Sequence, residues 1–434
     1  MNVKMTSTID KPAIHGGQPV RRRPFAKTCF GGPEEKALLL ECLESHEWST
    51  FRAGSDGHDV REIGVLTSAA AAAHPSTGLR WLGGRFVRRL EAQFAEYVGV
   101  EFAVSANSAT SGLVMALEAL GLGPGDEVLV PCMSFHATAT AILAANAVPV
   151  FTEVKDGTFC MDPADVEAKI TERSRALMVV HLGGNAADMD ALMALAGRHG
   201  LAVIEDCAQA PGVRYKGRQV GSIGHMGVFS LTETKTITCG EGGVVTTNDP
   251  ALALKLRLLR NHGEGVVEES WGDEELANLV GLNFRLTELQ AAVAIAQLGK
   301  LEERNQVRRN NAAYLVQRLA GRPALRPPEV EPGTDAACYI LKWRYRPEPG
   351  MPDRDAFVAA VEAEGIPLCA GYTRLLYQNP VFSRRNAVRP AACPRSEQIN
   401  REFVWFSAVH PPNTHADMDD VVEAIDKVLS WPGF

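Results

Sequence analysis

"LAVIEDCAQAPGVRYKGRQVGSIGHMGVFSLTETKTITCGEGGVVTT", residues 201–247, contains three short apolar runs separated by glycine-rich and polar turns. The runs "LAVIED", "MGVFSL" and "GGVVTT" have the length and the content of Val, Ile and Phe that are typical of buried strands. Four more runs of this kind lie upstream: "FAVSA" from Phe102, "EVLVP" from Glu127, "VPVF" from Val148 and "ALMVVHL" from Ala176. The sequence therefore predicts a sheet of seven strands.

Segments with a helical pattern separate these strands. "SGLVMALEALGLG" and "MDALMALAGRHG" repeat apolar residues every three or four positions and end in glycine, as many helices do. An alternation of strands and helices from about residue 85 to residue 250 is typical of a mostly parallel sheet that is covered by helices. We therefore predict an α/β fold for this part of the chain.

The segments after the sheet predict a second, smaller domain. Residues 286–320 have the pattern of long helices, and the proline-rich "GRPALRPPEVEPG" after them is typical of a domain junction. The C-terminal part combines short strands with amphipathic helices. We predict four parts: an N-terminal arm (1–50), an inserted or mobile loop (51–82), a large α/β domain (83–310) and a small α+β domain (311–434).

Composition and charge narrow the class of function. The 434 residues are 46% hydrophobic and 22% charged, as in ordinary globular proteins, and the formal net charge of -8 gives no basic surface for nucleic acid. The chain shows neither a secretory signal at its start nor an apolar run of about 18 residues, so we expect a cytoplasmic protein that binds no membrane. Its nine cysteines have no zinc-binding spacing, so we expect free thiols and no metal.

Asp206 ends the first of the three quoted strands, and Gln209 follows within one turn. Open α/β sheets bind their ligands at the carboxyl ends of the strands, so both side chains are candidates for a site there. The alternative is that Asp206 only caps the next turn.

Lys235 follows a later strand and is surrounded by serine and threonine residues. Such neighbours can hold the amine and partly desolvate it, which favours a lysine that forms imines. The alternative is an ordinary solvated lysine. A lysine and a carboxylate at two strand ends together match the needs of pyridoxal 5′-phosphate, which takes an imine-forming lysine and an acid beside its ring nitrogen.

Two further features fit this cofactor. Thr110 and Ser111 lead into an amphipathic helix whose N-terminus can bind a phosphate, and Ser230 offers another hydroxyl. Phe135 follows a strand and is a candidate to stack on the pyridine ring. The alternatives are an ordinary helix cap and ordinary core packing.

The motifs together resemble those of a known family. "VHLGGNAADMDALMALAGRHGLAVIEDCAQAPG" continues into "GVFSLTETKTITCGEGG", with "GLGPGDEVLVPCMSFHATATA" upstream and "RNHGEG" and "GLNFRLTELQ" downstream. Across roughly residues 83–310 the chain resembles the DegT/StrS-type sugar aminotransferases, a branch of the fold type I pyridoxal phosphate enzymes. "AIHGGQPVRRRPF" and "GYTRLLYQNPVF" look most like the subgroup that aminates cyclitol ketones such as scyllo-inosose. The resemblance implies an aspartate-aminotransferase-like fold.

The resemblance also implies roles for three polar residues of the quoted stretch. Lys235 is similar to the family's Schiff-base lysine, which also acts as the catalytic base. Asp206 is similar to the partner of the pyridinium nitrogen. Gln209 matches a glutamine near the phenolic oxygen of the cofactor.

The remaining cofactor-binding residues are carried over in the same way. Ser230, Thr110 and Ser111 fall where the family binds the phosphate, and Phe135 falls where an aromatic residue stacks on the ring. Asn283 matches an asparagine that reaches the phosphate bound by the neighbouring subunit, which implies a homodimer with shared sites. Gly183 stands where the family commonly has a larger residue, which we expect to widen the site.

The implied reaction moves an amino group from L-glutamine or L-glutamate to a keto-sugar or cyclitol ketone, in aminosugar, aminocyclitol or antibiotic biosynthesis. Two alternatives stay open. The chain can be an enzyme of the same fold that dehydrates, oxidises or aromatises its substrate, although the dehydratases of the family carry histidine where Lys235 stands. It can also be a non-catalytic or regulatory partner that has kept the fold.

Overall fold

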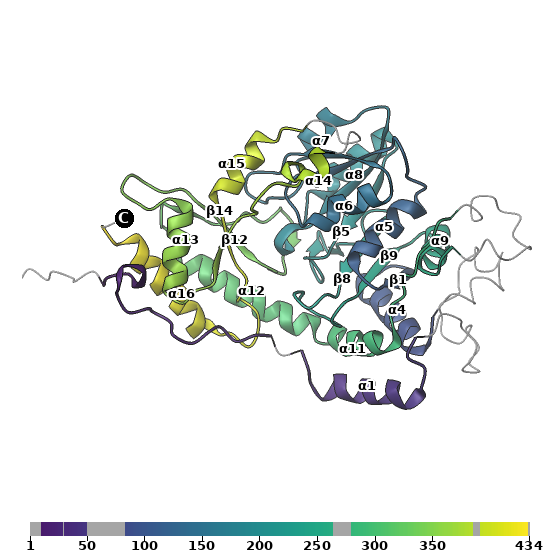
Figure 1. The fold of residues 1–434 in the computed structure, drawn as a ribbon, viewed down its shortest axis with the longest axis horizontal. Helices are drawn as coiled ribbons and strands as arrows, with labels where there is room; N and C mark the ends of the chain where they lie inside the picture. Colours follow the sequence, from purple (N-terminus) through teal and green to yellow (C-terminus); the bar gives the residue numbers. More distant parts are fainter. Residues whose placement is uncertain (1–9, 29, 50–82, 264–278, 385–390, 433–434) are drawn as a thin grey trace, which may run out of the picture.

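The computed structural model describes residues 10–28, 30–49, 83–263, 279–384 and 391–432 (Figure 1). The loop predicted at residues 51–82 lies outside the described residues. None of the described helices is long and apolar enough to cross a membrane.

A seven-stranded sheet forms the centre of the molecule, with the strand order β1-β9-β8-β5-β4-β2-β3. Its strands are β1 (Phe102–Ala106), β2 (Glu127–Pro131), β3 (Val148–Thr152), β4 (Ser174–Val180), β5 (Ala202–Asp206), β8 (Met226–Ser230) and β9 (Gly243–Thr247). Neighbours from β3 to β8 are parallel, whereas β9 is antiparallel to both β8 and β1. The mostly parallel sheet of seven strands is therefore confirmed.

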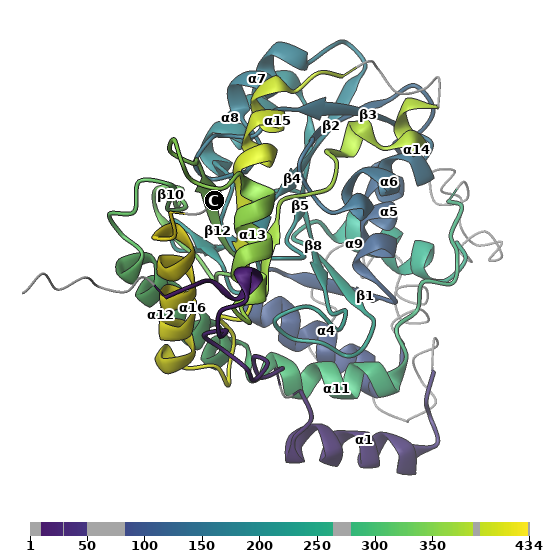
Figure 2. The same cartoon turned by 60° about the vertical axis from the view of Figure 1, so that its left-hand side comes forward.

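Helices pack against this sheet, so its strands are buried along most of their length. The helix α5 lies between α6 and α9 alongside the sheet (Figure 2). The helices around the sheet are α4 (Arg85–Val98), α5 (Ala109–Ala119), α6 (His136–Ala144), α7 (Pro163–Lys169), α8 (Met189–His199) and α9 (Pro250–Arg260). Short elements connect them: η3 (Leu182–Gly184), β6 (Arg214–Tyr215) and β7 (Arg218–Gln219).

A second, four-stranded antiparallel sheet has the order β10-β12-β14-β13. Its strands are β10 (Leu325–Arg326), β12 (Leu341–Tyr345), β13 (Leu368–Ala370) and β14 (Phe403–Phe406). A second hydrophobic core forms against it, in which the rings of Tyr345 and Phe357 stack 4.2 Å apart. The other elements of the C-terminal part are β11 (Thr334–Asp335), α13 (Arg354–Ala363), η5 (Leu376–Gln378), α14 (Pro380–Ser383), α15 (Pro394–Glu402) and α16 (His415–Leu429).

One long helix joins the two cores. After α11 (Glu288–Leu298), α12 (Leu301–Arg318) runs toward α16 (Figure 1). Leu301 of α12 belongs to the first core and Leu315 to the second. The domain boundary predicted at residue 310 falls inside this helix.

The N-terminal segment packs against both parts of the molecule. It contains η1 (Ala13–His15) and α1 (Pro33–Ser45), and α1 lies against α11. Arg21 is buried and pairs with Asp417 of α16 at 2.9 Å, while Ala26 donates from its backbone to Asn413. The segment therefore runs along the C-terminal part before it reaches α11.

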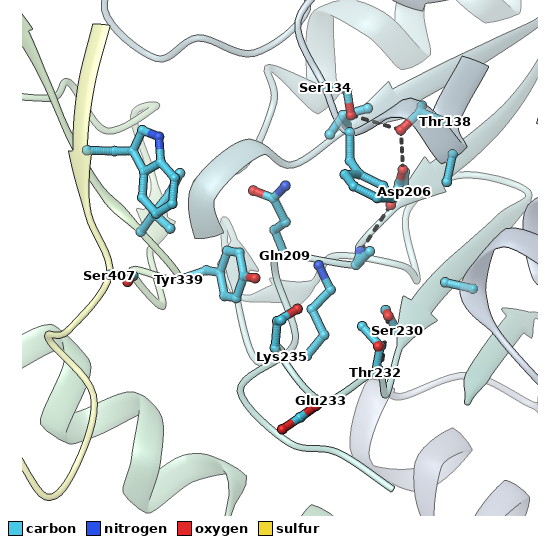
Figure 3. A pocket seen from close by; sticks show the side chains of 18 of the residues that line it. Ser134, Thr138, Asp206, Gln209, Ser230, Thr232, Glu233, Lys235, Tyr339 and Ser407 are labelled. Carbon is cyan, nitrogen blue, oxygen red and sulfur yellow. Dashed lines mark hydrogen bonds between the residues drawn. The ribbon is translucent and has the colours of Figure 1, made fainter. Parts of the chain in front are cut away.

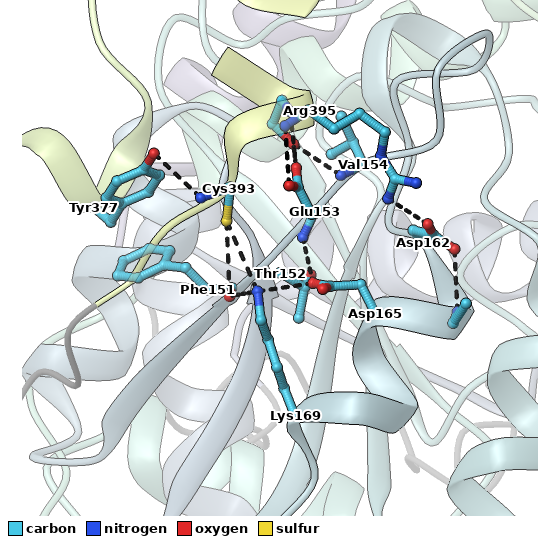
Figure 4. A network of polar contacts seen from close by, with 12 residues as sticks. Phe151, Thr152, Glu153, Val154, Asp162, Asp165, Lys169, Tyr377, Cys393 and Arg395 are labelled. Atoms are coloured by element: carbon cyan, nitrogen blue, oxygen red, sulfur yellow. Dashed lines mark hydrogen bonds and ion pairs between the residues drawn. The ribbon is translucent and has the colours of Figure 1, made fainter. Parts of the chain in front are cut away.

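Polar contacts also fix the start of α15 to the end of β3 (Figure 4). The carboxylate of Glu153 accepts hydrogen bonds from the backbone N–H groups of Arg395, at 3.1 Å, and Ser396, at 2.8 Å. The hydroxyl of Ser396 in turn accepts from the N–H of Val154 at 3.0 Å. These contacts hold the two sheets in a fixed relation and so define the space between them.

Candidate functional site

A cavity of about 1130 Å³ lies between the carboxyl ends of the central strands and the C-terminal part of the chain. The strand-end wall includes Asp206, Gln209, Ser230 and Lys235. The opposite wall comes from segments far away in the sequence. It includes Arg308, Tyr339, Ile340, Ala370, Gly371, Tyr372, Thr373, Phe403, Trp405, Ser407 and His410, with Lys27, Thr28 and Phe30 from the N-terminal segment.

Asp206, the last residue of β5, is only 6% exposed. Thr138 of α6 donates its hydroxyl to Oδ2 at 2.8 Å, and the N–H of Ala208 donates to Oδ1 at 3.1 Å. Burial raises the pKa of the Asp206 carboxyl, while these two hydrogen bonds and the charge of Lys235 oppose the rise. The bond from Ala208 shows that Asp206 caps the next turn, and Asp206 lines the cavity as well.

Lys235 lies in the turn after β8, and its side chain points between Gln209 and Asp206 (Figure 3). The side chain is half-buried, and its Nζ lies 4.9 Å from the centre of the Tyr339 ring. The backbone N–H of Gly183 donates to Oε1 of Gln209 at 2.8 Å and so fixes the direction of this amide. Amine, amide and carboxylate, which come from three places in the sequence, therefore meet in one cavity.

The N-terminus of α5 opens onto the same cavity. Thr110 of α5 and Ser230 at the end of β8 both line it. Ser111 does not, because its hydroxyl donates to Asn107 at 2.6 Å and its N–H donates to the hydroxyl of Ser108. Of the two residues predicted at this helix terminus, Thr110 lines the cavity and Ser111 belongs to the helix cap.

Phe135, the residue before α6, lines the cavity with 64% of its surface exposed. An aromatic ring in this state does not belong to the core, so the core-packing alternative does not hold. Asn283 is exposed outside the cavity of its own chain, where its side-chain oxygen accepts from the N–H of Arg285 at 3.4 Å. Its role at a neighbouring site stays a prediction.

Gly183 is buried, has a φ of +70° and does not line the cavity. A Cβ at this position would lie 3.0 Å from Cε of Lys342. Lys342 itself is buried, and its Nζ donates to the carbonyl oxygens of Leu182 at 2.7 Å and Thr158 at 3.1 Å. Gly183 therefore makes room for a lysine that braces η3, the turn whose Gly183 N–H binds Gln209, and the expectation that Gly183 widens the site is wrong.

Sequence reasoning missed most of the opposite wall. Phe403, Trp405 and Ser407 alternate along β14 and the residue after it, and this period of two was a signal for one face of a strand. His410 also lines the cavity, and its Nδ1 lies 2.9 Å from the hydroxyl of Thr28. Burial lowers the pKa of His410.

Comparisons with known proteins agree with this geometry. The sequence profile of the DegT/DnrJ/EryC1/StrS aminotransferase family matches residues 67–426. An L-glutamine:scyllo-inosose aminotransferase from Streptomyces griseus is 43% identical, over 96% of this chain and 97% of that protein. An L-glutamine:2-deoxy-scyllo-inosose aminotransferase from Streptoalloteichus tenebrarius is 38% identical, over 97% of this chain and 98% of that protein. The solved structure of an aminotransferase from Psychrobacter cryohalolentis has a TM-score of 0.79 and 30% identity, covering 93% of this chain and 98% of that chain.

Proposed function

Because this chain belongs to the DegT/DnrJ/EryC1/StrS aminotransferase family, we propose that it uses pyridoxal 5′-phosphate to move an amino group from L-glutamine or L-glutamate to a cyclitol ketone. One observation carries the proposal. The amine of Lys235 and the buried carboxylate of Asp206 line the same cavity, although they lie on different segments. A lysine that forms imines and an acid for the ring nitrogen are the two groups that this cofactor requires.

The other residues of the strand-end wall fit the cofactor. Burial of the Asp206 carboxylate raises its pKa, and a positively charged N–H of the ring would compensate for its charge. The N–H groups at the start of α5, with the hydroxyls of Thr110 and Ser230, would hold the phosphate. The exposed ring of Phe135 would lie against the pyridine, and Gln209 would bind the phenolic oxygen.

In this proposal the bound cofactor supplies an electron sink for the bonds at the donor's Cα. Lys235 would hold the cofactor until the amino group of the donor takes its place. Its free Nζ would then take the proton from Cα of the donor and later supply a proton to the carbon of the acceptor. Asp206 would provide a negative charge beside the ring nitrogen, and Tyr339 covers Lys235 from the opposite wall.

The proposed acceptor and donor rest on the two inosose relatives. The aromatic rings of Tyr339, Tyr372 and Trp405 on the opposite wall support them, since flat rings can pack against the C–H faces of a cyclitol. Hydroxyl and carboxylate groups at the cavity, such as Thr28, Ser407 and Glu233, can bind its hydroxyls. The product would be an aminocyclitol for antibiotic biosynthesis.

A homodimer with shared sites is part of the proposal. Asn283 is exposed outside its own cavity, and the apolar side chains of Val280 and Leu282 near it are 77% and 55% exposed. A second copy of the chain would cover them and bring Asn283 to its phosphate. Mixed dimers of Lys235→Ala and Asn283→Ala chains should regain part of the activity that each variant lacks alone. Absence of any recovery in verified mixed dimers would contradict a shared site.

The cofactor and the reaction can be tested in sequence. The purified protein is incubated with pyridoxal 5′-phosphate, its visible absorbance is recorded, and the bound form is reduced with borohydride before peptide mapping. We expect the label on Lys235. The pyridoxamine form is then mixed with ketocyclitols and keto-sugars, and return of the aldehyde form is followed. A protein that stays colourless contradicts the cofactor, and no response to any ketone favours dehydration, oxidation or aromatisation.

A further inference from the structure

Arg308 is a buried cation in the wall of the cavity. It lies on α12, is 5% exposed and lines the cavity opposite the strand ends. Its Nη1 donates to the carbonyl oxygen of Tyr339 at 3.1 Å. Its Nε makes no hydrogen bond within the described part of the chain, and no carboxylate there forms an ion pair with its guanidinium. Arg308 thus has spare donors and a charge that the described residues do not balance.

A charge without a partner is costly in a buried place, so buried charges are normally paired. Burial lowers the pKa of Arg308 to about 10, which still leaves the group protonated at neutral pH. Two other buried arginines of this chain pair with carboxylates: Arg260 with Glu91, and Arg21 with Asp417. Burial also lowers the pKa of Arg257, and its Nε makes no hydrogen bond within the described residues, but Arg257 does not line the cavity. Arg304, one turn earlier on α12, donates to Thr236 and Gln297 and does not line the cavity. Arg308 therefore fits an anion that enters the cavity from outside.

The position of Arg308 indicates which anion this is. Tyr339 accepts from Arg308 with its backbone, while its ring faces Nζ of Lys235 at 4.9 Å. In Figure 3, Tyr339 lies between Lys235 and Ser407. An amino acid carries its carboxylate on the same carbon as its amino group, so a site that exchanges amino groups at Lys235 needs a cation nearby. The phosphate site, by contrast, is expected at the start of α5.

We propose that Arg308 binds the α-carboxylate of the amino donor. This inference rests on the proposed function and adds the residue that recognises the donor as an amino acid. The planar guanidinium presents several N–H groups to the two oxygens of a carboxylate, and its bond to Tyr339 holds it in place. Arg308 is then a binding residue for the donor and has no part in proton transfer.

The test uses the full-length enzyme loaded with cofactor and two unreactive ligands. Glutaramate is L-glutamine without its amino group and keeps the carboxylate, and glutaramide is its uncharged counterpart. Their dissociation constants are measured by calorimetry for the wild type, Arg308→Gln, Arg308→Lys and Arg309→Gln. Arg309 is the matched control, because it follows Arg308 on α12 but does not line the cavity. Visible absorbance reports the bound cofactor in each protein.

We expect Arg308→Gln to weaken glutaramate binding by about tenfold or more while glutaramide binding stays unchanged. Arg308→Lys keeps the charge and should therefore lose less affinity for glutaramate. If Arg308→Gln does not fold, Arg308→Lys is compared with the wild type instead. Arg309→Gln should match the wild type. The proposal is overturned if Arg308→Gln binds glutaramate like the wild type, or if its main loss is of cofactor, which would assign Arg308 to the phosphate. If the wild type binds no cofactor, the proposed function is overturned as well. If the wild type transfers amino groups normally, only the proposal for Arg308 is overturned.

Discussion

The two walls of the cavity differ in how the chain supplies them. Asp206, Gln209, Ser230 and Lys235 lie within 30 residues of one another, and each is placed by the end of a strand or the turn after it. The opposite wall takes its residues from the N-terminal segment, α12, β13, β14 and three connections, so it depends on how distant segments pack. Under the proposed function the first wall holds the cofactor and the second recognises the substrates. On this proposal, the residues for the reaction chemistry come from one short stretch of the sequence, whereas the residues for recognition come from distant segments.

The largest expected effect is on the first wall. Lys235→Ala should lower amino transfer on the order of 10⁴-fold or more, because it removes both the imine-forming amine and the base. Single-turnover measurements with L-glutamine would show this. The exposed Lys216, outside the cavity, provides the control as Lys216→Ala. Amino transfer that survives in Lys235→Ala would mean that another residue is the base.

The next effect concerns the acid of the same wall. Asp206→Asn keeps the shape and one of the two acceptor oxygens, which bind Thr138 and the N–H of Ala208, but removes the charge beside the ring nitrogen. We expect the transfer rate to fall by about 10²- to 10³-fold, since a buried charge contributes strongly to stabilising the transition state. A rate within a few-fold of the wild type would remove Asp206 from this role.

Asp206 also makes the stability of the cofactor-free protein depend on pH. Burial raises the pKa of this carboxyl in the folded chain, so the folded protein holds the proton more tightly than the unfolded one. Compared with Asp206→Asn, the wild type should therefore lose stability as the pH rises from about 4, the ordinary value for Asp, through the raised pKa. Chemical denaturation of both proteins across this range measures the difference, and an opposite slope would contradict the burial argument.

A smaller effect on catalysis is expected behind the first wall, at the buried Lys342. Lys342→Met leaves the carbonyl oxygens of Leu182 and Thr158 without their lysine, which should lower the free energy of unfolding by about 2 kcal/mol. Burial lowers the pKa of Lys342, so the buried charge is itself unfavourable. Methionine removes this charge, which limits the loss of stability. Because Gly183 next to Leu182 orients Gln209, amino transfer should fall several-fold. Denaturant unfolding and single-turnover rates test the two parts separately, and a change in neither would show that the brace is not needed.

The smallest effect is expected at Phe135. Removing this exposed ring with Phe135→Ala should weaken cofactor binding by about threefold to tenfold. The cofactor-free protein should unfold as the wild type does, because the ring is not part of the core. Phe229→Ala is the contrast, since that ring is buried and its loss should cost about 3 to 5 kcal/mol of stability. Equal stability losses in the two variants would place Phe135 in the core after all.

The sequence was sufficient for the seven strands and for the approach of Lys235 to Asp206, because buried strands and their polar ends follow local patterns. It was not sufficient for Ser111, whose hydroxyl is taken by Asn107, a contact that depends on the exact turn before α5. Trp405 and Arg308 could not be predicted as site residues for a different reason. Their approach to Lys235 follows from the packing of one sheet against another, and only three-dimensional contacts show which face of β14 or α12 meets the cavity.

The continuity of α12 limits how this enzyme can be recombined with its relatives. Exchanging C-terminal halves is an obvious route to new acceptor ketones, since much of the opposite wall comes from that half. A junction at residue 310 would cut α12, which Leu301 and Leu315 anchor in the two cores. It would also lie two residues from Arg308. Crossovers placed beyond Arg318, at the end of the helix, would keep the donor specificity of one parent while importing the acceptor preference of the other.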